Sequence, residues 1–78
     1  NPNPNNGLAT LEVSASTTSD VIITVLDVTG RELMMMNKEL ANGVNQVAIH
    51  TADFANGLYY VNVKGGNENK VVRMVVNK

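Results

Sequence analysis

The chain of 78 residues is poor in several residue types, and each shortage excludes a class of site. It has no cysteine, which excludes disulfide bonds and thiolate metal sites. Six lysines and arginines are balanced by seven acidic residues, so no excess of positive charge favours nucleic-acid binding. The longest mostly apolar run, residues 21–26, is far shorter than the roughly 20 residues that a transmembrane helix needs. We therefore expect neither a nucleic-acid-binding nor a membrane-spanning protein.

Residues that carry catalysis are scarce as well. His50 is the only histidine, and no serine lies in the Gly-x-Ser-x-Gly turn of a hydrolase. We expect His50 to be exposed at a strand end rather than to act as a base or ligand, and we expect the protein not to be an enzyme. Asp27 and Asp53 lie in predicted turns, where carboxylates bond to backbone amides more often than to calcium. No metal ion or cofactor is expected.

The chain is rich in β-branched residues. Valine (12), threonine (6) and isoleucine (3) make up 21 of the 78 residues, and this class packs well on sheets and loses rotamer freedom in helices. Another 12 residues are asparagine, mostly in or beside glycine and proline positions, as tight turns require. Alternation of period two predicts six strands about ten residues apart, which is typical of an all-β sandwich. The predicted strands cover residues 8–14, 21–26, 31–40, 44–51, 58–64 and 70–77.

The predicted hairpin at residues 21–40 carries the most specific expectations. Residues 21–26 are apolar on both sides, which is typical of a central strand, and a type I turn closed by Gly30 with positive φ returns the chain. Residues 33–36 are four consecutive apolar residues, so one buried face would leave two of them toward solvent. The methionines among them pack in the core or form an adaptable contact surface. We predict a weak homodimer through this edge strand, with Met34 and Met36 as contacts.

The later strands have clear inner and outer faces. Tyr59 is placed to form a tyrosine corner, with its hydroxyl turned back onto upstream backbone, and Gly57 before it is expected to adopt a conformation that β-branched residues resist. The side chains predicted to point inward are Val47, Ile49, Tyr59, Val61, Val63, Val72, Met74 and Val76. Those predicted to point outward from the last strand are Val71, Arg73, Val75 and Asn77.

The first seven residues are all asparagine, proline or glycine. Each proline fixes its own φ and extends the residue before it, so we expect residues 1–7 to be a semi-rigid linker to an upstream passenger and residues 8–78 to form the sandwich. The start lacks a methionine, a basic segment and an apolar segment, so it does not read as a secretory signal peptide. We therefore expect a piece of a longer chain.

Five segments follow one another in a recognisable order. They are NPN at 3–5, VLDVTGR at 25–31, LANGVN at 40–45, GLYYV at 57–61 and KVVRMVVNK at 70–78. Together they cover nearly the whole chain, and in this order it resembles the C-terminal sorting domain (type A) of the type IX, or Por, secretion system of Bacteroidetes. The resemblance implies an immunoglobulin-like β-sandwich of about seven antiparallel strands, in which the seventh would come from splitting residues 31–40.

The resemblance also implies a function. Such domains sit at the end of secreted cargo, are recognised in the periplasm by translocon and shuttle proteins, and cross the outer membrane with the cargo. A sortase-like peptidase then removes them, and the cargo is joined to anionic lipopolysaccharide or released. A secreted or cell-surface protein is therefore expected. Alternatives are an adhesion, spacer or carbohydrate-binding module of an extracellular protein.

The family pattern can be carried over to individual residues. Pro4, Gly30, Gly57 and Tyr59 are the expected structural positions, with Gly30 and Arg31 as the turn glycine and its basic neighbour. The terminal basic residues, Lys70 and Lys78, are expected to be solvated. The predicted contacts with the secretion machinery are Arg31, Lys70, Val71, Arg73, Val75 and Lys78.

Overall fold

A computed structural model of the chain describes residues 7–66 and 68–77, and all of its regular structure is β. The strands are β1 (Leu8–Ala15), β2 (Ser19–Asp27), β3 (Glu32–Leu40), β4 (Gly43–His50), β5 (Gly57–Gly65) and β6 (Glu68–Val76). Each of the six strands predicted from the two-residue alternation is therefore confirmed. Over these residues, no helix has the length and apolar character needed to cross a membrane.

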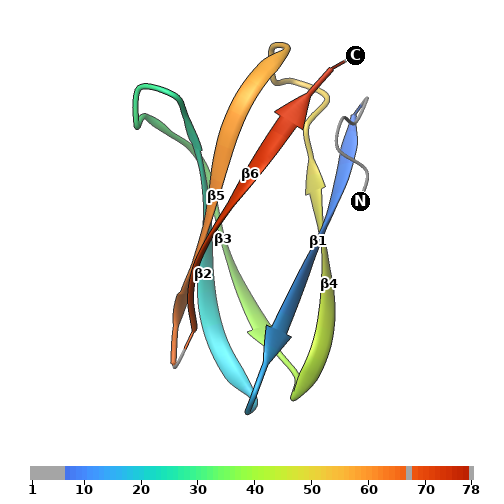
Figure 1. Cartoon of the computed structure of the whole chain (residues 1–78), viewed down its shortest axis with the longest axis vertical. Coiled ribbons are helices and arrows are strands. Elements are labelled where there is room, and N and C mark those ends of the chain that lie inside the picture. The colour runs from blue at the N-terminus through green and yellow to red at the C-terminus, as the bar shows by residue number, and fades with distance from the viewer. Residues whose placement is uncertain (1–6, 67, 78) are drawn as a thin grey trace.

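The strands form two antiparallel sheets that face each other (Figure 1). One sheet pairs β1 with β4, and the other has the order β3-β2-β5-β6. The predicted β-sandwich is confirmed, and β2 is a central strand as expected. The seven-strand expectation is wrong for the described residues, because β3 runs unbroken from Glu32 to Leu40 against β2. A register shift between Val25 and Leu26 marks a bulge in this pairing.

The core lies between the two sheets and is built from the predicted inward faces. Ile23, Val25 and Val63 are fully buried, and Leu40 closes the core at the end of β3. All the side chains predicted to point inward from β4, β5 and β6 are buried except Val72, which is half-buried against the same cluster. Burial of this kind contributes roughly 1.5–3 kcal/mol per large aliphatic side chain, so these faces hold the sheets together.

The methionine run of β3 is divided between the two faces of its sheet. Met34 and Met36 are half-buried and pack against the core, whereas Met35 is 62% exposed on the other face. Leu33 also packs against the core, because the register shift between Val25 and Leu26 leaves Leu33 without a partner of its own in β2 and breaks the alternation of faces there. The expectation that two of these four apolar residues face solvent is therefore wrong, and Met34 and Met36 do not form an exposed pair.

Three segments meet at one end of the sandwich. Asp27, Tyr59 and Met74 are cross-strand neighbours, so the β2–β3 hairpin lies at the end where β6 finishes. The start of β1 lies at the same end, since Leu8 pairs with His50 at the end of β4 (Figure 1). The end of β5, the start of β6, the start of β2 and the end of β1 lie at the opposite end (Figure 1).

Candidate functional site

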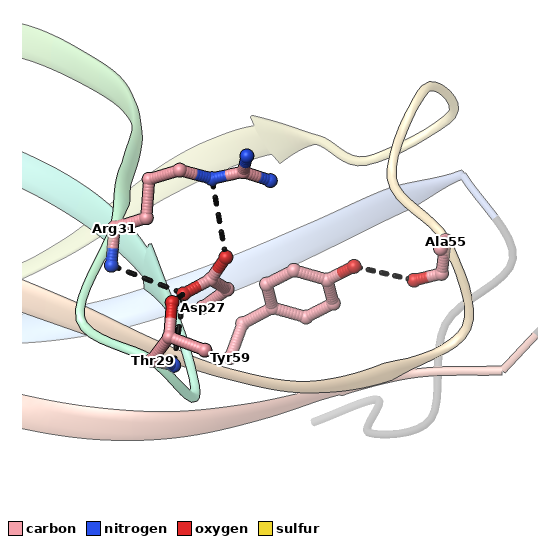
Figure 2. Close-up of polar contacts among 5 residues, drawn as sticks. All are labelled: Asp27, Thr29, Arg31, Ala55 and Tyr59. Atoms are coloured by element: carbon pink, nitrogen blue, oxygen red, sulfur yellow. Dashed lines mark hydrogen bonds and ion pairs between the residues drawn. The ribbon is translucent and has the colours of Figure 1, made fainter.

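The hairpin between β2 and β3 is held by one carboxylate. The Gly30 amide donates to the Asp27 carbonyl at 3.0 Å, and Gly30 has φ of 89°, which favours glycine. Asp27 Oδ1 accepts from Thr29 N at 2.9 Å, Thr29 Oγ1 at 2.6 Å and Arg31 N at 3.0 Å (Figure 2). The hydrogen bond from the Thr29 hydroxyl is the main reason that the pKa of Asp27 is lowered. The predicted turn, in which Asp27 bonds to nearby backbone amides, is confirmed.

Arg31 projects from this hairpin with most of its side chain accessible. Its Nε lies 3.3 Å from Asp27 Oδ2, and its side chain is 75% exposed (Figure 2). A surface ion pair of this kind contributes little to stability. The pair instead restrains the guanidinium at the tip of the hairpin, where a partner can reach it.

Tyr59 forms the predicted tyrosine corner. Its hydroxyl donates to the Ala55 carbonyl at 2.6 Å (Figure 2), and its ring stacks on Phe54 with centroids 5.1 Å apart. Gly57, two residues earlier, has φ of 153°, which L side chains rarely adopt. The tyrosine therefore fixes the loop after β4 against the start of β5, next to the hairpin.

Asn45 is a structural residue that the sequence reasoning missed. Its Oδ1 accepts from Ala41 N at 2.8 Å, and its Nδ2 donates to the carbonyls of Ala41, Gly43 and Val13 at 2.9, 3.2 and 3.2 Å. The side chain thus closes the β3–β4 connection and ties it to β1. The available signal was an asparagine just after an Asn-Gly turn, where asparagine commonly bonds to backbone.

Strand β6 presents the predicted alternation and lies at one edge of the four-stranded sheet. Val71 is 63% exposed, Val75 is 37% exposed, and Arg73 is exposed between them. These three residues share the outer face of the sheet. The outward positions predicted for the closing strand are confirmed, since these side chains are exposed.

Lys70 lies on the other side of β6. It is half-buried, and its Nζ donates to the Ser14 carbonyl at 3.0 Å, across the gap to β1. The expectation that Lys70 is solvated therefore holds only in part, because the residue is half-buried while its bond to Ser14 lies at an exposed position. Lys70 has the inward register of the strand and lies toward the end of the sandwich, where its ammonium reaches a backbone oxygen.

The structure brings only some of the predicted contact residues together. Arg73, Val75 and Arg31 lie toward the end of the sandwich that carries the hairpin, whereas Lys70 lies near the opposite end. Pro4 and Lys78 lie outside the described residues.

Comparison with known families decides the identity. A family model described as "Secretion system C-terminal sorting domain" matches residues 1–77. The chain belongs to this family. It is a sorting domain of the type IX secretion system. The match supports a role as a secretion signal that interacts with this secretion machinery. The protein that carries the domain passes the outer membrane. Searches of curated proteins and of solved structures found no match.

The segments that mark this sorting domain have different physical roles. Asp27 and Gly30 shape the hairpin, Asn45 closes the β3–β4 connection, and Gly57 with Tyr59 fixes the loop before β5. The last segment supplies the edge strand. Most of the family pattern is therefore explained by folding, whereas the side chains of Arg31 and of the outward residues of β6 are exposed.

The described residues contain few other candidate sites. Across residues 7–66 and 68–77, no group of three or more histidine, aspartate or glutamate side chains is placed to hold a metal ion. An open pocket of about 480 Å³ lies over β2 and β3 and is lined by Asp20–Ile22 and Asn37–Glu39. Its mixed charges and shallow shape assign no ligand.

Proposed function

We propose that this chain is a non-catalytic sorting signal that directs an upstream cargo protein through the type IX translocon, with the outer side of β6 read by the machinery. The family match over residues 1–77 carries the proposal. The cargo passes from the periplasm to the cell surface, and translocon and shuttle proteins bind the domain on the way.

The geometry of β6 supports its part in recognition. Among the strands of the described residues, β6 lies at the edge of the four-stranded sheet, a position where a binding partner can approach the side of a sheet. Its outward side chains are exposed, and Arg73 adds a positive charge between Val71 and Val75. Arg31 lies toward the same end of the sheet, so a partner that follows β6 toward its end can also reach the hairpin.

We further propose that a sortase-like peptidase removes the domain at the surface by cleaving ahead of the sandwich. The Gly7 carbonyl accepts from Thr51 N at 2.9 Å, so the chain is tied to the fold from Gly7 onward. Cleavage upstream of this point leaves the sandwich intact and frees the cargo for attachment or release.

A reporter fusion tests the sorting function. Residues 1–78 are attached to a periplasmic reporter in a bacterium that has a type IX system, and the reporter is located by fractionation. We expect the reporter at the cell surface or in the medium, with the domain removed. A reporter that stays in the periplasm would contradict the proposal and favour an adhesion, spacer or carbohydrate-binding module.

Matched variants of the same fusion test the role of β6. Val71→Ser and Arg73→Ala are expected to reduce export while leaving the melting temperature nearly unchanged, because both side chains are exposed. Val44→Ser is the control, since Val44 on β4 is 65% exposed, close to the 63% of Val71. Equal export of all three variants and the parent would place recognition elsewhere, with Arg31 as the next residue to change.

The two terminal lysines need separate treatment. Lys70→Ala removes the bond to Ser14, so we expect a stability loss of roughly 0.5–1.5 kcal/mol, and its export must be read beside a melt. For Lys78, two glycines appended after it test whether a free end is read. Normal export of that extended chain would exclude the free end as part of the signal.

A further inference from the structure

The outer face of the four-stranded sheet carries exposed apolar side chains on three of its four strands. This face points away from the β1–β4 sheet (Figure 1). Ile22 is 46% exposed, Met35 62%, Val71 63% and Val75 37%, all on neighbouring strands of this one face. Leu26, Leu58 and Tyr60 are half-buried among them. Contiguous apolar surface of this kind marks an interaction site.

The outer face is arranged in rows that have a simple symmetry. In β3-β2-β5-β6 order, one row reads Met35, Thr24, Asn62, Val71. The next row reads Glu32, Leu26, Tyr60, Arg73. The first row is apolar at both ends and polar in the middle. The second is charged at its ends, with opposite signs, and apolar in the middle.

We infer that this outer face binds a second copy of the same chain, about a two-fold axis that runs parallel to the strands between β2 and β5. Such an axis lays each row over the same row of the partner in reverse order. Packed sheets keep their strand directions within about 30° of each other, so facing rows stay in reach. Met35 then meets the second copy's Val71, and Leu26 meets its Tyr60, each contact occurring twice.

The charges on the outer face fit this arrangement. Outward acidic residues lie on β3 and β2, at Glu32, Glu39 and Asp20, and outward basic residues lie on β5 and β6, at Lys64 and Arg73. In the two-fold dimer each Glu32 faces an Arg73 of the other copy, twice. The opposite arrangement, β3 over β3, would oppose like charges and is disfavoured.

The size of the outer face sets the strength of the dimer. Four strands about 4.8 Å apart, with outward side chains over about 25 Å of their length, present a face of about 500 Å². Two copies would bury about 1,000 Å² in total, at the low end of specific interfaces. The dimer is therefore weak and forms at high protein concentration.

Sedimentation equilibrium of the 78-residue chain, from micromolar to millimolar concentration, tests the dimer. We expect a reversible monomer–dimer equilibrium for the parent. Glu32→Lys and Arg73→Glu are each expected to raise the dissociation constant about tenfold or more, because two attractive contacts become repulsive. A melt of each variant checks that both remain folded.

Mixing these two variants gives the sharper test. In a mixed dimer, the lysine introduced at position 32 of one copy faces the glutamate introduced at position 73 of the other, and the second contact keeps its native Glu32–Arg73 pair. Both contacts are then attractive. We expect the mixture to associate about as well as the parent, and the double variant Glu32→Lys/Arg73→Glu to regain self-association.

Apolar variants and a matched control complete the test. Val71→Lys should abolish association, whereas Val44→Lys, at an equally exposed position on the other sheet, should not change it. A parent that is monomeric at millimolar concentration would overturn the inference. So would association that survives Val71→Lys, as pairing through the edge of β3 would, or single charge variants that do not recover on mixing.

Discussion

The side chain of Asn45 offers the clearest test of how this small domain is held together. Asn45→Ala removes the Oδ1 acceptor and the Nδ2 amide, which donates to three carbonyls. Ala41 and Gly43 are exposed, so water can replace their three bonds and each loss contributes about 0.5 kcal/mol. Val13 is 1% exposed, so the lost bond to its carbonyl is not readily replaced and contributes about 1–1.5 kcal/mol. The expected total is about 2.5–3 kcal/mol.

A loss of this size is large for a domain of 78 residues, whose whole free energy of unfolding is about 4–12 kcal/mol. Thermal melts should show a fall in melting temperature of about 10–24 °C, at about 4–8 °C per kcal/mol. Urea melts at one pH give the free energy directly. Asn45→Asp keeps the acceptor but turns a second oxygen toward the carbonyls, so it should lose at least as much stability as the alanine variant.

The control is Asn37→Ala, which removes an exposed asparagine from β3 and should change the free energy of unfolding by no more than about 0.5 kcal/mol. If Asn45→Ala also stays within that range, or if the aspartate variant is as stable as the parent, the bonds of Asn45 do not hold the β3–β4 connection and the reasoning fails.

Three further predictions follow from the turns and corners. Tyr59→Phe should lose about 0.5–1.5 kcal/mol in urea melts, because one hydrogen bond to backbone is removed while the ring still stacks; parent-like melts would exclude the corner as a stabilising contact. Gly57→Val should lower the free energy of unfolding by more than about 1 kcal/mol, because Gly57 has a positive φ. Gly65→Ala should lower it further, because the added Cβ would also lie 2.8 Å from the Cα of Val21. Equal losses in urea melts would exclude a steric collision at Gly65. The pKa of Asp27 is lowered, so the stability that its carboxylate supplies is present above the ordinary value near 4 and is lost as pH falls through the lowered pKa. A carboxyl NMR titration should place its midpoint below the ordinary value, and removing the Thr29 hydroxyl by substitution with valine should raise it.

The turns explain why much of this fold could be predicted from the sequence. Asp27 and Gly30 form a local unit in which carboxylate, amides and positive φ lie within five residues, so the local sequence predicts the hairpin. The tyrosine corner of Tyr59 spans only four residues and was predictable for the same reason. The inner and outer faces of β6 followed from its alternation, because successive side chains of a strand point to opposite faces.

Two expectations did not hold in full, one at the end of the sandwich and one at a bulge between two strands. Lys70 has an inward register, but only the position of β1 decides that its ammonium meets the Ser14 carbonyl instead of water. The orientation of Leu33 depends on a bulge against β2, and a bulge reverses the face assignment of the residues beyond it. Neither outcome is visible in the alternation of β3 or β6 taken alone.

The sequence by itself therefore determined the strands, their turns and the two faces of each strand, since these depend on residues within a few positions of one another. Tertiary structure decided which strands became neighbours. The pairing of β2 with β5 gathers Leu26 beside Tyr60 on one outer face, and the pairing of β1 with β4 brings the amide of Asn45 to a carbonyl 32 residues away. Such contacts depend on how the sheets assemble around a shared core, and no local pattern in the chain encodes that choice.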